Sequence, residues 1–351
     1  MNARQRILNI INQMTDQELS LVLSNLFSST KIESNEDYTI DCCPHCGSIR
    51  IKKNGHTNGY QRYICLDCKK SFSDKTNSFF KNSKISKDKW LKFIDYEITG
   101  ITLAEEAYYM KLSIPTCFKM RHRIYQGISS YVSDNVRLKD TVELDSAYRK
   151  INLKGTKPQN MPRKSKKRGN TSAYSGISHH KLCIASGIDE HDNMFLKVVG
   201  LGSESFEKYK KVFHYFDKVD CLVTDSKTSM NQVSNKLGTA LDKIETKANQ
   251  KRYTTKNGNS LGDINELHQE VTKLITRTHG ISTRYIQGYL DFITIKKKVH
   301  YSFDRSEQAS AILSMLEKTY IWNEKIVLKP EMPISLKEAY YEYHYGIFSG
   351  C

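Results

Sequence analysis

The sequence predicts a multidomain protein that combines the α+β and α/β fold classes. Two CxxC pairs near the N-terminus indicate a small metal-bound module. Helical periodicity with basic residues follows in residues 86–127. From Thr141 onward, short apolar strands and one helix alternate, which predicts a domain built on a mixed sheet.

The composition favours a polyanionic partner. The 351 residues are enough for two or three domains, and 54 Lys and Arg oppose 38 Asp and Glu, a net charge of +16. Nucleic acid is the usual partner of such a chain, and a basic protein with solvated lysines is the alternative. No apolar run of about 18 residues predicts a membrane span. We also expect no secretory signal, because the N-terminal stretch is amphipathic without a cleavage site.

Cysteine usage fits a reducing compartment. We expect a cytoplasmic protein, in which the nine cysteines serve as metal ligands sooner than as disulfides. Residues 1–38 show apolar positions at helical spacing and predict an N-terminal helical segment with a packing role.

Residues 39–80 predict a zinc ribbon. The two CxxC pairs, Cys43/Cys46 and Cys65/Cys68, are separated by 18 residues, and each pair aims two thiolates at one point. Four thiolates complete a tetrahedral structural Zn²⁺ site. A hairpin with a turn at Asn58-Gly59 fits between the pairs. Cys42 is an alternative to Cys43, and the CPxC spacing favours Cys43.

Residues 84–130 predict helices, the last of them over Ile114–Tyr125. This last helix carries Lys119, Arg121 and Arg123 as candidate DNA contacts. A helix, a short turn and a basic second helix favour a helix-turn-helix whose second helix enters the major groove. An ordinary helical hairpin with a solvated basic face is the alternative, and the neighbouring zinc module favours DNA.

A basic loop is predicted between Arg149 and Arg168. This stretch holds nine Lys and Arg, no Asp or Glu, and two prolines and a glycine that break any helix. Such a loop suits salt-dependent contact with phosphates, and a solvated surface loop is the alternative. The candidate DNA contacts within it are Arg163, Lys164, Lys166, Lys167 and Arg168.

The catalytic domain is predicted over residues 138–300. Its elements come in the order strand, strand, strand, helix, strand, namely Val142–Ala147, Lys181–Ile188, Met194–Val199, Ser205–Phe216 and Cys221–Asp225. This order matches the ribonuclease-H-like plan, in which the first and fourth strands lie side by side. Asp145 and Asp225 end these strands and suit shared coordination of two Mg²⁺ about 4 Å apart.

Two further helices are predicted after these strands. The first, within residues 257–276, is amphipathic, and Asn265 and His268 flank its apolar stripe. The second covers Ser282–Ile295. Residues 301–351 contain no motif, so they are a C-terminal tail of unknown role.

Several ordered segments over roughly residues 40–300 carry a resemblance to a known family. They are RYICLDCKKSF, VELDSAY, HHKLCIASGID, LVTDS and INELHQEVTKLI followed by THGISTRYIQGYLDF. Together they resemble the insertion-sequence transposases of the IS fifteen-ninety-five group. That group has an N-terminal zinc ribbon and a ribonuclease-H-like DDE-type domain.

The resemblance implies the roles of individual residues. Asp145 is the first catalytic carboxylate and Asp225 the second, and the third position, which is Glu, Asn or His in the group, falls on Asn265. These three residues would bind two catalytic Mg²⁺, for which Mn²⁺ can substitute. The Lys that usually follows is replaced by Thr272, with Lys273 next to it. The carboxylates Asp263, Glu266 and Glu270 are alternatives to Asn265. His268, one helical turn after Asn265, is a candidate for orienting the substrate, and a packed or surface histidine is the alternative.

The resemblance also implies a function. The protein is expected to be a transposase that binds double-stranded DNA at element ends and at the target, and acts as a homo-oligomer during the reaction. A bacterial, nucleoid-associated location follows from the same resemblance. The alternatives are a DNA-binding regulator, a catalytically inactive derivative, and a structure-selective nuclease on the same fold.

Overall fold

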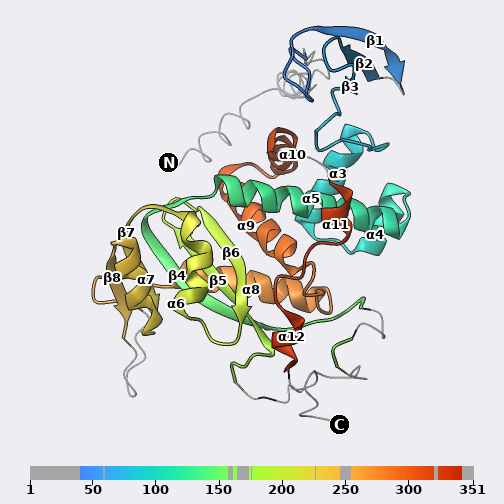
Figure 1. Ribbon diagram of the computed structural model, residues 1–351. Helices are drawn as coiled ribbons and strands as arrows, with labels where there is room; N and C mark the ends of the chain where they lie inside the picture. The colour runs from blue at the N-terminus through green and yellow to red at the C-terminus, as the bar shows by residue number, and fades with distance from the viewer. Residues whose placement is uncertain are drawn as a thin grey trace, which may run out of the picture. The chain divides into compact units, whose positions relative to one another are not determined.

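The structure is a computed structural model that describes residues 40–57, 60–156, 161–163, 174, 176–225, 227–245, 254–319 and 323–341 (Figure 1). Predictions outside these residues concern the N-terminal helical segment, the Asn58-Gly59 turn, and Lys164, Lys166, Lys167 and Arg168. The chain divides into two compact units, residues 1–74 and 75–351. The finer domain boundaries stay predictions.

The described part of the first unit is built on a small antiparallel sheet. Strands β1 (Ile51–Thr57), β2 (Tyr60–Cys65) and β3 (Ser71–Ser73) pair in that order. Its buried core consists of Cys43, Cys65 and Phe72. So small a core stabilises little by itself, which makes a bound metal the natural source of its folding free energy.

The second unit begins with three helices, each started by a local cap. They are α3 (Lys87–Thr99), α4 (Leu103–Met110) and α5 (Ile114–Asn135). The side chains of Ser86, Thr102 and Ser113 accept from backbone N–H groups in the first turns, and Thr102 forms a capping box with Glu105. The predicted helix pair is therefore present.

Helix α5 runs ten residues beyond its predicted end at Tyr125. The buried Ile128 and Val132 continue its apolar stripe, and the helix packs against α9 (Ile286–Ser302). Ile128 and Val132 are four residues apart, a helical spacing that predicts the longer helix.

Helix α5 directs two of its three candidate DNA contacts into the protein. Arg121 pairs with Glu97 at 2.5 Å and with Glu106 at 2.9 Å; both carboxylates are buried, and only 11% of the Arg121 side chain is exposed. Arg123 is buried and donates to the backbone carbonyls of Phe79 and Lys81. These contacts give both arginines a structural role, because a side chain closed inside the fold cannot reach a phosphate.

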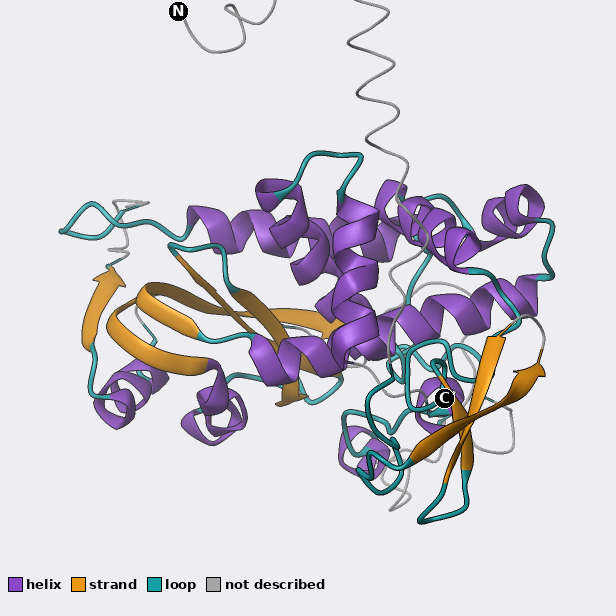
Figure 2. Cartoon of the chain, turned by 90° about the horizontal axis from the view of Figure 1, so that it is seen from above, coloured by secondary structure: helices purple, strands orange, loops and turns teal. Residues whose placement is uncertain are grey.

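A five-stranded mixed sheet forms the centre of this unit. Its strands, in the spatial order β6-β5-β4-β7-β8, have the bounds β4 (Leu138–Lys150), β5 (Lys181–Asp189), β6 (Met194–Leu201), β7 (Phe216–Asp225) and β8 (Ala240–Ile244). Strand β5 runs antiparallel to both of its neighbours, β4 and β6, whereas β7 and β8 run parallel to β4 (Figures 1 and 2). The predicted adjacency of the first and fourth strands is confirmed.

Helices cover both faces of the sheet. They are α6 (Phe206–Tyr209), the 3-10 helix η2 (Lys210–Tyr215), α7 (Ser229–Leu237), α8 (Gly262–Arg277) and α9. Helix α8 contacts β4 on the face of Glu143, whereas Tyr209 of α6 hydrogen bonds to Ser146. Since odd and even residues of a strand point to opposite faces, α8 and α6 lie on opposite sides of β4.

The predicted tail folds onto the helices. It contains α10 (Gln308–Thr319), α11 (Glu324–Leu328) and α12 (Leu336–Ala339). Helix α10 packs against α3, α5 and α9, and α11 packs against α5. These segments thus help to bury the helical layer. None of the described helices has the length and apolar character needed to cross a bilayer.

The buried ion pairs of Arg121 predict a stability effect. Arg121→Met leaves Glu97 and Glu106 buried without their cation, and should lower the free energy of unfolding by about 3–5 kcal/mol. Lys119→Met, on the same helix but in an exposed pair with Glu324, should cost less than about 1 kcal/mol. Urea unfolding measures both, and equal losses would contradict the structural role of Arg121.

Candidate functional site

Four cysteines of the first unit converge on one point. The Sγ atoms of Cys43, Cys46, Cys65 and Cys68 all lie within 4.8 Å of one another. Cys43 and Cys46 form one knuckle and Cys65 and Cys68 the other, each closed by a residue with positive φ, Gly47 and Lys69. Cys42 is exposed and lies outside this four-cysteine cluster.

The dimensions of the four-cysteine cluster suit zinc. The Sγ–Sγ distances are 3.7 Å for Cys43–Cys68 and 3.6 Å for Cys46–Cys65. A tetrahedron with Zn–S bonds of about 2.3 Å has edges of about 3.8 Å. Hydrogen bonding, first of all to the backbone of Cys68, lowers the pKa of the Cys65 thiol to about 6. An all-sulfur donor set of this size could hold Zn²⁺.

In the second unit, strand pairing brings two predicted catalytic residues together. Glu143 of β4 is aligned with Val223 of β7, and the two strands are parallel. Two residues further along each strand are Asp145 and Asp225. Both side chains are partly exposed, 19% and 34% respectively.

Lys227 lies between these carboxylates and a third one. Its Nζ is 2.6 Å from Glu204 Oε1, 2.9 Å from Asp225 Oδ2 and 3.4 Å from Asp145 Oδ1. Burial opposes the charged form, but the hydrogen bond to Asp225 and the charges of all three carboxylates raise the pKa of Lys227. We call Asp145, Glu204, Asp225 and Lys227 the acidic centre.

Glu204 is the most deeply buried carboxylate of the acidic centre, with 4% of its side chain exposed. Tyr209 donates a hydrogen bond to its Oε2 at 2.9 Å, and the Glu204 N–H donates to the Tyr148 hydroxyl at 3.3 Å. Burial raises the pKa of Glu204, and the charge of Lys227 counters this only in part. The carboxylate is therefore held in place by residues of α6 and β4.

Helix α8 adds a histidine beside Asp145. His268 Nε2 is 2.8 Å from Ser186 Oγ, and Nδ1 is 3.9 Å from Asp145 Oδ2. Ser186 is the β5 residue paired with Asp145, so both side chains point to the α8 face. Burial lowers the pKa of His268 despite the opposing charge of Asp145, which favours a neutral ring at pH 7.

Strand β4 also holds α8 in place. Glu143 Oε2 accepts a hydrogen bond from the Ile264 N–H at 2.9 Å, in the first turn of α8. Arg149 donates to the carbonyl of His268 at 3.1 Å and to Thr272 Oγ1 at 2.7 Å. The first contact satisfies a backbone group that a helix start leaves open. Glu143 and Arg149 thus fix the position of His268.

In the described structure, no hydrogen bond or ion pair joins the other residues considered on α8 to the acidic centre. Asn265 and Asp263 are exposed, Glu266 pairs with Lys297 and Glu270 pairs with Lys273. Among the described residues of α8, His268 has the ion-pair distance to Asp145. The assignment of Asn265 as third ligand stays a prediction.

Two candidate DNA contacts are described apart from Arg121 and Arg123. Lys119 is partly exposed and pairs with Glu324. The Arg163 guanidinium lies 5.6 Å from the ring centre of Tyr340. Both side chains already have partners within the protein, so the described structure gives no direct test of their role in DNA binding.

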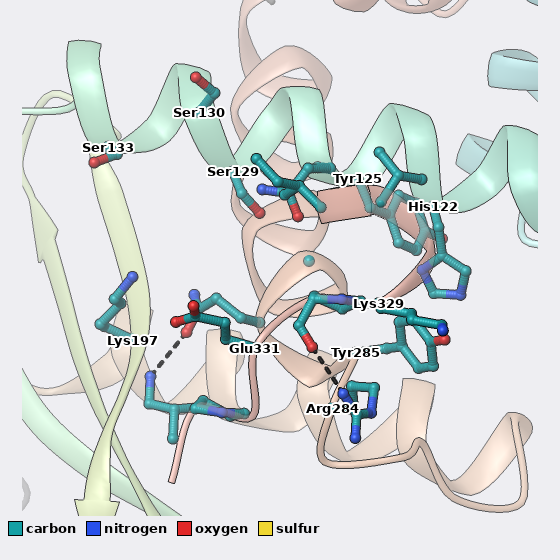
Figure 3. A pocket seen from close by; sticks show the side chains of 18 of the residues that line it. His122, Tyr125, Ser129, Ser130, Ser133, Lys197, Arg284, Tyr285, Lys329 and Glu331 are labelled. Carbon is teal, nitrogen blue, oxygen red and sulfur yellow. Dashed lines mark hydrogen bonds between the residues drawn. The ribbon is translucent and has the colours of Figure 1, made fainter. Parts of the chain in front are cut away.

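A separate cavity of about 800 Å³ lies among α5, β6, the start of α9 and residues 326–333. Figure 3 shows His122, Tyr285, Lys197, Arg284 and Lys329 around it. Burial and the charge of Arg121 lower the pKa of His122 to about 3, so this ring is neutral. The lining contains no residue of the acidic centre, and the cavity is distinct from the candidate site.

Glu204 and Lys227 are not among the site residues that the sequence predicts. Lys227 stands two residues after Asp225 in the LVTDSK stretch, so its proximity could have been inferred from the strand end. Glu204 follows strand β6 in GSESFE, and only the chain path across the sheet brings it to Asp145.

Comparison with known proteins gives a limited result. No protein family matches the chain. An uncharacterized protein in the transposable element ISH50 of Halobacterium salinarum is 28% identical over 114 residues. The chain is distantly related to an insertion-element protein. The match spans 32% of this chain and 38% of that protein, and because the relative is archaeal, a bacterial origin is not supported.

Among solved structures, the similarity of this chain to a transpososome is weak. A pre-cleavage Mos1 transpososome has 11% sequence identity over 66% of this chain and 78% of its own. The TM-score is 0.19, a value too low to support an argument about fold or function.

The four-cysteine cluster predicts a zinc content of about one ion per chain, measured by atomic emission on protein purified without added metal. Cys65→Ser removes one thiolate and should lose most of the zinc, together with the fold of the first unit. Cys42→Ser is the matched control and should keep the zinc. Zinc well below one per chain in the unaltered protein would contradict the site.

Proposed function

We propose that this protein is a DNA transposase that cuts and joins strands with two divalent metal ions held by Asp145, Asp225 and a third residue. The finer assignment is a ribonuclease-H-like transposase of the IS fifteen-ninety-five group. Support comes from the strand order β6-β5-β4-β7-β8, which fits that plan, and from the distant relation to an insertion-element protein.

One observation carries the proposal: Asp145 and Asp225 come from adjacent parallel strands and both approach the same ammonium group. Carboxylates placed so closely repel each other unless a cation lies between them. Mg²⁺ prefers hard oxygen donors, which both residues supply. The buried Glu204 Oε1 is also suited to bind a cation. Within the described structure this oxygen has no hydrogen bond and is stabilised by the charge of Lys227.

The chain's own residues supply the geometry of the site. Asp145 and Asp225 would hold the metal ions, which activate the attacking oxygen and stabilise the leaving oxygen when bound. Ser186 and Arg149 hold His268 beside Asp145, where its neutral ring can donate or accept one hydrogen bond at the substrate. Asn265, exposed one helical turn earlier, remains the proposed third ligand.

We assign DNA binding to the zinc ribbon, the basic loop and, on α5, Lys119, since Arg121 and Arg123 are held inside the protein. The net charge of +16 supports a polyanionic partner. Element ends and target DNA would be bound together, which implies a homo-oligomer during the reaction.

Loss of either aspartate should abolish strand cutting. Asp145→Asn and Asp225→Asn each remove a metal-binding charge while keeping the side-chain shape, and should lower the rate of cutting at least about a hundredfold. The assay uses purified protein, Mg²⁺ or Mn²⁺, and DNA carrying the ends of the element. Asp217→Asn, an exposed change on the same strand β7, should leave the rate unchanged.

Three outcomes would overturn parts of this proposal. If both aspartate variants still cut DNA, Asp145 and Asp225 are not the ligands of the catalytic metal ions. Unaltered protein that binds the ends but never cuts would favour a regulator or an inactive derivative. Cutting that ignores the end sequence would favour a structure-selective nuclease.

The basic loop should act through charge. Changing Arg163, Lys164, Lys166, Lys167 and Arg168 to Gln should weaken binding equally on all duplex sequences and flatten the slope of log K against log[salt] by up to about 4.5. A control that exchanges each Lys for Arg and each Arg for Lys should keep the slope. Fluorescence anisotropy measures both, and a sequence-selective loss would contradict phosphate contact.

A further inference from the structure

Lys227 occupies the place in the acidic centre where a cation is needed. Its Nζ contacts carboxylate oxygens from three separate segments, β4, the end of β7 and the segment between β6 and α6. Three carboxylates and one ammonium leave a net charge of −2. A divalent ion in place of the ammonium would leave a net charge of −1, because it neutralises two of the three negative charges whereas the ammonium neutralises one.

Lys227 can leave this position. Its side chain is 36% exposed and follows the end of β7, so the ammonium can turn outward on its flexible stem. Glu204 cannot do the same, because it is 4% exposed and is held by Tyr209. Tyr209 in turn hydrogen bonds to Ser146 at 2.8 Å, next to Asp145 in the chain.

The two oxygens of Glu204 have different surroundings. Oε2 accepts the Tyr209 hydrogen bond, while buried Oε1 has no well-directed hydrogen bond in the described structure and faces Lys227 at 2.6 Å. A buried carboxylate oxygen in this state is costly unless a cation accompanies it. In the described structure, Oε1 therefore pairs with the Lys227 ammonium, and this oxygen is open to a metal ion if the ammonium leaves.

We infer that Glu204 is a metal ligand of the proposed site, and that Lys227 is an internal counter-ion that the incoming metal displaces. This inference rests on the proposed function, since it takes Asp145 and Asp225 as metal ligands. It adds a third carboxylate to them and a competitor that weakens metal binding. In the metal-free protein the three carboxylates are thereby paired with the Lys227 ammonium, and this pairing lowers the affinity for the metal.

The test measures metal binding and needs no DNA. Mn²⁺ is titrated into the zinc-loaded full-length protein, and electron paramagnetic resonance reports free Mn²⁺. Titration of a variant with both Asp145→Asn and Asp225→Asn gives the background, which includes the exposed Asp140, Glu190 and His191 cluster.

Two changes should shift the affinity in opposite directions. Lys227→Met removes the competing charge and should tighten Mn²⁺ binding about tenfold or more. Glu204→Gln removes a ligand charge and should weaken binding about tenfold or more. Lys227→Arg keeps the charge and should bind Mn²⁺ like the unaltered protein. Circular dichroism checks that each variant is folded.

Matched controls lie on the neighbouring helix turn. Glu207 and Lys210 form an exposed ion pair close in sequence to Glu204. Glu207→Gln and Lys210→Met alter the net charge by the same amounts and should leave the Mn²⁺ affinity unchanged.

The outcomes separate this inference from the proposed function. Saturable Mn²⁺ binding that depends on Asp145 and Asp225, but not on Lys227 or Glu204, would overturn the inference and leave the proposed function standing. Absence of such binding in the unaltered protein would overturn both. A folded Glu204→Gln variant with unaltered affinity would by itself remove Glu204 from the ligand set.

Discussion

The acidic centre of the second unit depends on one electrostatic constraint, the approach of Asp145, Asp225 and Glu204 to one point. Like charges at these distances disfavour the ionised state unless a cation is present. The Lys227 ammonium, 2.6–3.4 Å from the three carboxylates, supplies that cation within the protein. The arrangement keeps the fold stable without metal and keeps the ligands preorganised for one.

Strand β4 connects the parts of this arrangement. It carries Asp145, and on the same face Glu143 and Arg149 hydrogen bond to α8. On the other face, Tyr148 hydrogen bonds to Glu204, and Ser146 hydrogen bonds to Tyr209, which holds the Glu204 carboxylate. Parallel pairing with β7 places Asp225 alongside. A shift of β4 by one residue would turn Asp145 to the wrong face and disconnect α8 and Glu204 together.

Local patterns predicted the parts of the structure that depend on nearby residues. The cysteine spacing predicted the four-cysteine cluster, and the order of apolar strands predicted that the strands of Asp145 and Asp225 are neighbours. Glu204 was missed because its approach to Asp145 depends on the path of the chain after β6. The sequence could have predicted that Arg121 points into the protein. Arg121 lies four residues after the buried Cys117, and residues at this spacing share one face of a helix.

Anomalous diffraction from crystals of the protein soaked in Mn²⁺ tests the displacement of Lys227 by a metal most directly. We expect an anomalous peak at about 2.1 Å from carboxylate oxygens of Asp145, Asp225 and Glu204. The Lys227 side chain should then have turned away from the three carboxylates. Full Mn²⁺ occupancy elsewhere, with the Lys227 ammonium still between the carboxylates, would contradict this displacement.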